Sequence, residues 1–235
     1  MVRGSGRVGP EPRTWPSAPQ SLPVWTAKDH LDIPGPPAYG TAMLATTGST
    51  KKAWTEEELQ ALPEEGCIHE VVNGALVMSP KNNFHHESIC GRLQFALQSY
   101  NREHRLGVVR ASSAGYWMFN RNCRAPDLSF IPKARLDSLG FKPSARRFFP
   151  GAPDLAVEVL SPGNTRVEMD QRLSEFFASG TQIAWVINPE AECVEVCHAP
   201  GQRQRLDASG ALDGEHLLPG FRYAVVDLFK EWDWE

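Results

Sequence analysis

Apolar and polar residues alternate with regular periods from about residue 55 onward, and these periods predict helices and strands. The stretch "FHHESICGRLQFALQSYNREH" carries Ile89, Leu93, Leu97 and Tyr100 at helical spacing, which predicts one long amphipathic helix. The stretch "CIHEVVNGALVMSP" has two apolar-rich runs around an Asn-Gly pair, the dipeptide that most strongly favours a two-residue hairpin turn. A hairpin followed by a long helix is therefore predicted over residues 67–104.

Further elements follow from capping and strand signals. Thr55 begins the short helix "TEEELQALP", and Thr165-x-x-Glu168 is a capping box for a helix that ends before Gly180. The segment from Pro132 to Pro153 is predicted to be loop. Strands are predicted in "LGVVRASSAGYWMF", "APDLSFIP", "LAVEVL", "QIAWVINP", "CVEVCH" and "FRYAVVDLF". This order predicts an α/β fold of the α+β kind, with a mixed sheet flanked by helices and an antiparallel part.

Residues 1–45 lack this periodicity and are rich in Pro, Gly, Ser and Thr. We expect a disordered or low-complexity extension there and a folded domain over 46–235. Met43 is a second candidate start of translation. The segment "GSGRVG" matches the dinucleotide-binding fingerprint by letter, but no strand precedes it and prolines follow it, so we assign it no function.

Composition and charge narrow the possible functions. The 235 residues have a formal net charge of −4, so any contact with nucleic acid requires a local basic patch. No apolar stretch approaches a membrane span, and we expect a cytoplasmic protein. The five cysteines are scattered and are expected to be reduced thiols. "CVEVCH" has the spacing of a strand, with Cys193 and Cys197 on one face, and argues little for zinc.

Three carboxylates stand in apolar surroundings. Glu158 lies inside a run, residues 155–160, that looks buried on both faces, where an isolated charge is costly. Asp127 follows a proline and opens an apolar run, and Glu70 lies in the first hairpin strand. Asp127 could instead cap a turn, Glu70 could face solvent on an edge strand, and Glu158 could pair with an arginine. Together the three acids predict an oxygen-rich site suited to Mg²⁺ or Mn²⁺.

The segments "HEVVNGALVMSP", "FHHESICGRL", "RAPDLSFIP", "GAPDLAVEVLSPGNTR" and "SGTQIAWVINPE" resemble the Uma-type restriction endonuclease family, part of the PD-(D/E)XK nuclease superfamily. The resemblance covers about residues 52–232. It implies a restriction-endonuclease-like fold and metal-dependent cleavage of DNA phosphodiester bonds. For most members of the family neither the substrate nor the biological role is established.

The resemblance also implies roles for individual residues. Asp127 matches the aspartate that opens a strand, and Glu158 matches its acidic partner. Both would bind the metal, together with the backbone carbonyl of Val159. Glu70 resembles the accessory acid contributed early in the chain, and His86 resembles a family histidine at the start of the long helix.

Two positions complicate this assignment. Asp154 also follows a proline and competes with Asp127, although the family joins acids from two different strands. The superfamily's lysine position holds Leu160, and the matching residue on the following helix is Arg172. Arginine can stabilise phosphate charge but is no plausible general base, because its pKa lies too high. An Arg172–Glu158 ion pair with a purely structural role is the alternative.

Contacts with DNA are the least specific expectation. Arg121, Arg124, Arg146 and Arg147 could hold a phosphate backbone, as could the helix N-terminus at Thr165. An ordinary solvated surface explains the arginines equally well. The leading hypothesis is a Mg²⁺-dependent endonuclease, and the second is an impaired, nuclease-derived module that binds DNA or protein. The end "DLFKEWDWE" could contribute to a homodimer, but packing on its own domain is favoured.

Overall fold

The structure is a computed structural model that describes residues 53–63, 67–79 and 81–231. The predicted extension over 1–45 and its "GSGRVG" segment lie outside the described residues. The helices are α1 (Glu56–Gln60), α2 (Phe84–His104), α3 (Lys133–Ser138), α4 (Arg166–Ala178) and α5 (Val226–Phe229). The strands of the main sheet are β3 (Gly107–Ala111), β6 (Leu128–Pro132), β8 (Leu155–Val159), β9 (Ile183–Asn188), β10 (Cys193–Ala199) and β11 (Gln202–Leu206).

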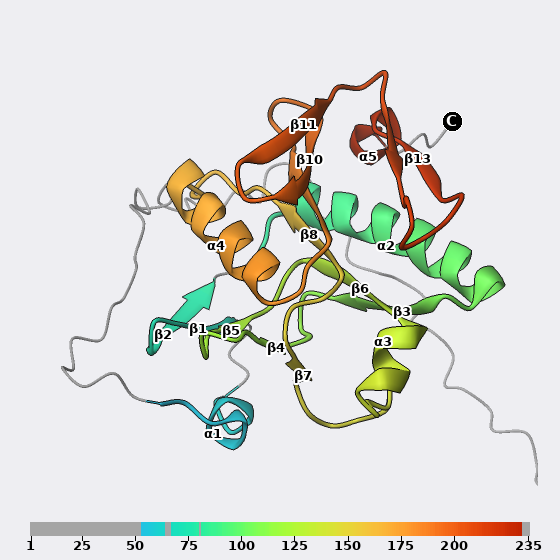
Figure 1. The fold of residues 1–235 in the computed structure, drawn as a ribbon. Coiled ribbons are helices and arrows are strands. Elements are labelled where there is room, and N and C mark those ends of the chain that lie inside the picture. Colours follow the sequence, from blue (N-terminus) through green and yellow to red (C-terminus); the bar gives the residue numbers. More distant parts are fainter. Residues whose placement is uncertain (1–52, 64–66, 80, 232–235) are drawn as a thin grey trace, which may run out of the picture. The chain divides into compact units, whose positions relative to one another are not determined.

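The main sheet has the order β11-β10-β9-β8-β6-β3 and is mixed, because β8 and β9 are parallel while the other pairs are antiparallel. Helices α2 and α4 lie on opposite sides of β8 (Figure 1). Leu155, Val157 and Val159 belong to the core cluster that contains the α2 side chains, whereas Ala156 packs with Met169 of α4. Both faces of β8 are therefore covered, as its continuous apolar run predicts.

A second sheet has the order β2-β1-β5-β4-β7. Its strands are β1 (Ile68–Val72), β2 (Ala75–Ser79), β4 (Tyr116–Trp117), β5 (Cys123–Arg124) and β7 (Phe149–Pro150). Asn73 and Gly74 have φ of 53° and 82°, so the hairpin turn is left-handed at both positions, as predicted. Because β1 lies between β2 and β5, it is no edge strand, and Glu70 is only 2% exposed. The solvent-facing alternative for Glu70 is wrong.

Local signals at the helix ends agree with the structure, and one predicted loop does not. Capping boxes form at Thr55 and Thr165. The segment between Pro132 and Pro153, predicted to be loop, contains α3 and β7. Helix α3 is six residues long and buries Leu136 alone, so it offers too few apolar positions for a helical period to be visible.

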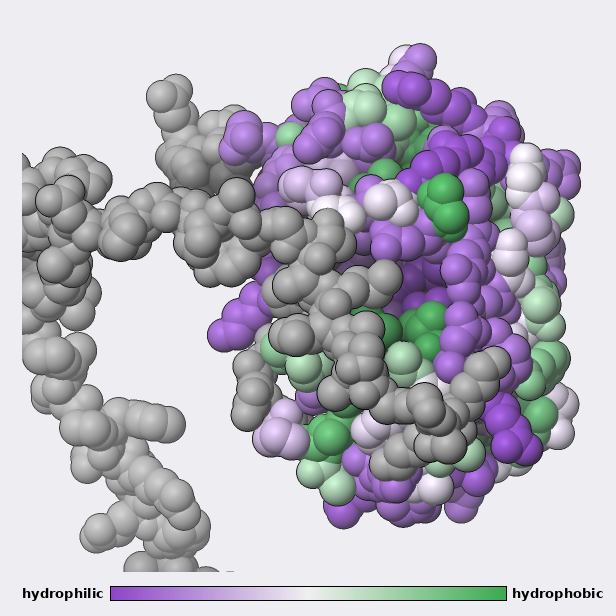
Figure 2. Space-filling model, turned by 90° about the vertical axis from the view of Figure 1, so that its left-hand side faces the viewer, coloured by the Kyte–Doolittle hydropathy of each residue, from purple (hydrophilic) through white to green (hydrophobic). Residues whose placement is uncertain are grey.

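The C-terminal part packs on the main sheet's α2 side. A small sheet, β12 (Ala211–Asp213) with β13 (Arg222–Ala224), precedes α5, and Leu228 and Phe229 join the α2 core cluster. The prediction that the C-terminal segment "DLFKEWDWE" packs on its own domain is thus confirmed as far as Phe229. In the face shown in Figure 2, hydrophilic residues dominate the coloured surface and hydrophobic ones form small separate patches. No described helix has the length and apolarity that crossing a membrane requires.

Leu93→Ala tests the packing of α2 on the sheet. Leu93 is fully buried, so the cavity should lower the free energy of unfolding by about 2–5 kcal/mol. Phe95→Ala, on the same helix but with Phe95 75% exposed, is the control and should change it by less than about 0.5 kcal/mol. Urea unfolding followed by tryptophan fluorescence measures both. Equal losses in the two variants would contradict this arrangement of the helix.

Candidate active site

Asp127 lies where the β6–β8 ladder ends. The last β6–β8 pair is Leu128 with Val157, and the Asp127 carboxylate extends it by accepting the Val159 backbone N–H at 2.8 Å through Oδ2. The side chain is 12% exposed. Asp127 therefore satisfies a backbone donor and keeps a carboxylate at the end of β8, next to the strand residue Glu158.

His86 lies against the same two groups. It is the third residue of α2, which begins at the Asn83 N-cap, and its Nε2 is 3.3 Å from Asp127 Oδ2 and 3.1 Å from the Val159 carbonyl oxygen. Burial lowers the pKa of His86, but the hydrogen bond and charge of Asp127 outweigh burial and raise the pKa above its usual value. The expected metal ligands Asp127 and Val159 thus converge on one point that attracts positive charge.

Glu158 points to the other face of β8, toward α4, and is 7% exposed. Its Oε1 accepts a hydrogen bond from Arg172 Nη1 at 2.8 Å. Burial raises the pKa of Glu158 to about 8, with smaller contributions from the charges of Asp127 and Glu70, while Arg172 acts in the opposite direction. The ion pair considered in the sequence is present, and it only partly offsets the cost of burial.

Arg172 joins two of the three predicted acids. Its Nη2 donates a hydrogen bond to Glu70 Oε2 at 2.5 Å, and its Nη1 donates to Glu158. The other oxygen of Glu70 accepts the backbone N–H of Ala125 at 2.8 Å. Glu70 therefore uses both oxygens on protein donors and holds Arg172 in place from the hairpin sheet.

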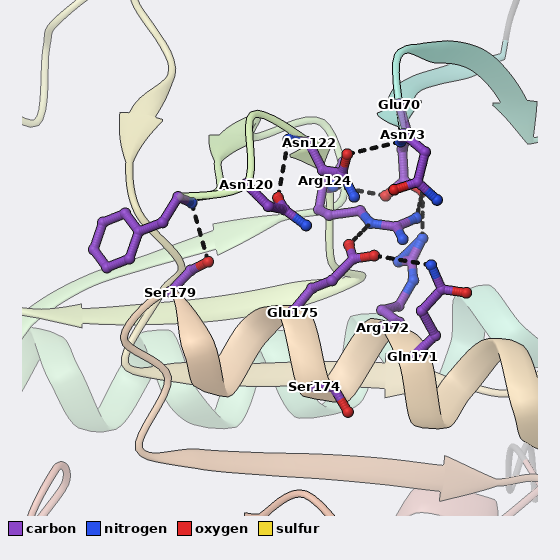
Figure 3. A network of polar contacts seen from close by, with 12 residues as sticks. Glu70, Asn73, Asn120, Asn122, Arg124, Gln171, Arg172, Ser174, Glu175 and Ser179 are labelled. Carbon is purple, nitrogen blue, oxygen red and sulfur yellow. Dashed lines mark hydrogen bonds and ion pairs between the residues drawn. The ribbon is translucent and has the colours of Figure 1, made fainter. Parts of the chain in front are cut away.

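The buried arginine–carboxylate network continues beyond the predicted residues (Figure 3). Arg124 donates through Nη1 to Glu70 at 3.2 Å and through Nε to Glu175 at 2.7 Å. The side-chain amide of Gln171 donates a further hydrogen bond to Glu175. Burial raises the pKa of Glu175, but its hydrogen bonds, that of Arg124 first, lower it overall. Arg124 is 6% exposed and is engaged by Glu70 and Glu175, so it lies beneath the surface, and its contact with DNA stays a prediction. Glu175 was missed, although a charge among Leu173, Phe176 and other buried α4 residues was a visible signal.

The other predicted residues lie elsewhere. Asp154 precedes β8 at its opposite end, where it binds Arg135 at 2.8 Å and Gln182 at 2.7 Å. Thr165 caps α4 with its side chain, and Arg121 is exposed with a left-handed φ of 66°. The exposed Arg146 and Arg147 line a pocket on the segment between α3 and β7. The structure thus gathers seven predicted residues and separates Asp154, Thr165, Arg121, Arg146 and Arg147 from them; the seven are Asp127, Glu158, Val159, Arg172, Glu70, His86 and Arg124.

A polar pocket of about 330 Å³ opens beside His86. It lies where β8 and β9 end and α2 begins, and this end of parallel strands is a common place for ligands. Its wall is made of short polar side chains and the ends of these elements: Asn83, His85, His86, Leu160, Ser161, Pro162, Asn164, Asn188, Pro189 and Glu190. His86 lies in the wall of this pocket and contacts Asp127, which does not line the pocket itself.

The donor set fits a divalent cation. In the described part of the chain, His86, Cys90 and Asp127 place ligand atoms within 4.8 Å of one another. Burial, first of all, raises the pKa of Cys90, so its thiol stays protonated and is a weak ligand. The site also holds two more carboxylates than guanidinium groups: Asp127, Glu70, Glu158 and Glu175 against Arg124 and Arg172. Oxygen donors with a net negative charge suit Mg²⁺ or Mn²⁺.

Comparison with known proteins agrees with this geometry. Residues 56–226 match the model of the Uma2 family, described as "Putative restriction endonuclease". The chain belongs to the Uma2 family. No curated protein matches the chain. The family and the mixed sheet between α2 and α4 confirm the predicted restriction-endonuclease-like fold.

A solved structure shares the fold of this Uma2 protein. It is the crystal structure of a "putative nuclease belonging to DUF820" from Anabaena variabilis ATCC 29413. The TM-score is 0.64 at 21% sequence identity, and the match covers 75% of this chain and 97% of that one. Family and fold together point to a nuclease.

Glu158→Gln tests the burial of the central carboxylate. The folded protein keeps the Glu158 proton up to about pH 8, whereas the unfolded chain releases it near the ordinary value of 4.5. Folding must then take up a proton between these pH values, so wild type loses stability as pH rises through this window. Glutamine carries no such proton. The unfolding free energy of the variant relative to wild type should therefore rise with pH, by on the order of a few kcal/mol.

Urea unfolding in metal-free buffer between pH 4.5 and 8 measures this difference. Glu57→Gln, on the exposed side of α1, is the control over the same range. A flat difference between Glu158→Gln and wild type would show that Glu158 is ionised throughout.

Proposed function

We propose that this Uma2 protein is a Mg²⁺- or Mn²⁺-dependent endonuclease that hydrolyses DNA phosphodiester bonds at the Asp127–Glu158 site. The observation that carries the proposal is the convergence of the Asp127 carboxylate and the Val159 carbonyl on His86 Nε2, at 3.3 and 3.1 Å. A buried point with two oxygen donors and excess negative charge is suited to a divalent cation. Family membership adds nucleic acid as the substrate class.

The residues divide into ligands and supports. Asp127 and the Val159 carbonyl would hold the cation, with Glu158 as the acid from the neighbouring face of β8. When bound, the cation would activate water and offset negative charge on phosphate. His86 would either contribute neutral imidazole nitrogen or turn aside, since its Nε2 now contacts both oxygen donors. Glu70 would act through Arg172 as a positioning residue, because both its oxygens are engaged by protein donors.

Arg172 supplies a fixed positive charge. Burial lowers the pKa of Arg172, but Glu158 and Glu70 outweigh burial and raise it above the ordinary value. Arg172 therefore cannot accept a proton at neutral pH and would act only on the charge of the phosphate and the acids. The water must then lose its proton to solvent, to the phosphate or to His86.

A second candidate, an impaired nuclease-like module that binds DNA, has one observation in its favour. Both terminal nitrogens of Arg172 are already occupied by Glu158 and Glu70, at 2.8 and 2.5 Å. A guanidinium engaged in this way contacts phosphate only if one of these bonds is exchanged. Such a module would bind DNA and the cation without cleaving.

Plasmid nicking with Mg²⁺ and with Mn²⁺ separates the two functions. Asp127→Asn and Glu158→Gln should each lower the nicking rate about a hundredfold or more, because each removes a carboxyl group that would ionise on binding the cation or is already ionised. Arg172→Lys should keep or raise the rate, since it retains the charge. Asp213→Asn, which changes a surface acid paired with Arg222, is the control and should nick at the wild-type rate.

The outcomes of this assay are distinct. Equal nicking by wild type and both acid variants would mean contamination and would refute the assigned site. Nicking by Arg172→Lys alone would identify a nuclease silenced at this position. Bound but uncut DNA with every protein would favour the binding module.

Cation binding can be measured without DNA. Wild type should bind Mn²⁺ in calorimetric titration, and Asp127→Asn should weaken this binding at least tenfold, because a charged ligand is lost. EDTA should abolish nicking, and added Mn²⁺ should restore it. Undiminished Mn²⁺ binding by Asp127→Asn would place the cation elsewhere.

A further inference from the structure

A larger pocket, about 450 Å³, lies apart from the candidate active site. It is bounded by β3, the end of β6, α3 and the segment that leads from α3 to β7. Its volume falls within the range of pockets that bind small ligands or parts of larger ones. None of the residues assigned to the Asp127–Glu158 site lines it, so it requires its own explanation.

The charge of this pocket is entirely positive among the described residues that line it. Arg110, Arg146 and Arg147 face it, and no Asp or Glu does. Glu56 touches the wall, where its carboxylate accepts the Phe148 backbone N–H at 2.6 Å, but it does not line the pocket. Three arginines gathered without a lining acid are notable in a chain whose net charge is −4.

The arginines of this pocket are also free of carboxylate partners within the described chain. Arg110 donates to the carbonyl oxygens of Val109 and Pro143, and Arg147 lies 5.0 Å from the centre of the Phe141 ring. Elsewhere in the same part of the chain, arginines such as Arg124 and Arg172 are paired with acids. Guanidinium groups that have no carboxylate partner keep their full positive charge for a phosphate group, which arginine can bind in a forked geometry.

Aromatic rings form another part of the wall. Phe141 and Phe148 are partly exposed and line the pocket beside the arginines, whereas Tyr116 lines it from beneath and is only 1% exposed. Gly115 lets the Phe148 ring approach the backbone, because a Cβ there would lie 2.7 Å from that ring. In such a wall the rings provide stacking surfaces for bases, and the guanidinium groups provide positive charge for phosphate. This combination favours a nucleotide unit over a simple inorganic anion.

The pocket and the candidate site are connected by both sheets. Asp127 directly precedes β6, and Ile131, near the end of β6, lines the pocket. At the usual rise per strand residue, Asp127 and Ile131 are about 13 Å apart. In the second sheet, three strand spacings, about 14 Å, separate β1 with Glu70 from β7 with Phe149. The axial rise of a stacked B-form strand is about 3.4 Å per nucleotide and an unstacked strand is more extended, so either path corresponds to at most about four nucleotides.

We propose that the pocket of Arg110, Arg146 and Arg147 binds a nucleotide of the substrate strand through its phosphate, at most about four nucleotides from the bond cleaved at the Asp127–Glu158 site. This inference rests on the proposed nuclease function and adds to it a second point of attachment. The pocket would hold the strand in register, and it would contribute to binding rather than to the chemical step.

Binding without cleavage tests the pocket directly. In EDTA, a fluorescein-labelled 20-nucleotide single strand is titrated with wild type and with R146A/R147A, whose two side chains are exposed. The double variant should bind about tenfold more weakly, and the slope of log affinity against log salt should fall by about 1.4, the value for two phosphate contacts on a single strand. R102A/R205A removes the same charge from exposed positions on α2 and β11 and should bind like wild type.

Shorter ligands distinguish a strand from a free nucleotide. An unlabelled eight-nucleotide strand should compete with the probe, and deoxyadenosine monophosphate at the same concentration should not. Equal competition by the mononucleotide would overturn the strand assignment in favour of a free-nucleotide site. If R146A/R147A and R102A/R205A have equal affinity and equal salt slope, the assignment of this pocket as a phosphate site is refuted.

Cleavage separates failure of this inference from failure of the proposed function. With Mg²⁺, R146A/R147A should raise KM for a long strand and leave kcat within about twofold of wild type, because it acts on binding alone. Cleavage by wild type with an unchanged KM in R146A/R147A would refute only the pocket. No binding of DNA by wild type even at low salt would refute both.

Discussion

The burial of Glu158 is the constraint on which the site depends. Strand β8 lies between α2 and α4, so any side chain along it is removed from water on either face. A lone carboxylate there would cost several kcal/mol, and the protein offsets that cost with Arg172 at 2.8 Å. The offset is incomplete, since burial still raises the pKa of Glu158 to about 8. An acid kept in so unfavourable a place is more readily explained by a role in chemistry than by stability.

The same constraint links the two sheets. Arg172 holds Glu158 of the main sheet and Glu70 of the hairpin sheet. Arg124 then joins Glu70 to Glu175 on α4 (Figure 3). Each added charge requires a partner because none of these groups reaches bulk water easily. Removing one member leaves another buried and unpaired, which typically costs more than the pair itself contributes. The hairpin sheet is thus held against the main domain by the polar network as well as by apolar contacts.

Sequence patterns predicted the parts of this arrangement that depend on local periodicity. The hairpin turn at Asn73-Gly74, the long helix α2 and the capping box at Thr165 follow from rules that act within a few residues. The buried Glu158 was visible as a charge in an apolar run. The Arg124–Glu175 pair joins residues 51 positions apart, and Arg124 looks like any surface arginine until β5 is placed beside β1. Helix α3 was missed because one buried leucine makes no period.

The position of Arg172 limits how the site can work. A lysine at this place could lose its proton when buried, whereas Arg172 cannot, because two carboxylates hold its charge. Its positive charge is therefore constant, and the chemistry must be adjusted by the groups around it. Against the effect of burial, the hydrogen bond and charge of Asp127 hold the pKa of His86 above its ordinary value, and its ring lies between Asp127 and the Val159 carbonyl, in the wall of the polar pocket. Because Arg172 cannot accept a proton, the acceptor in the proposed reaction would have to be solvent, the phosphate or His86, which lies on the opposite face of β8 from α4.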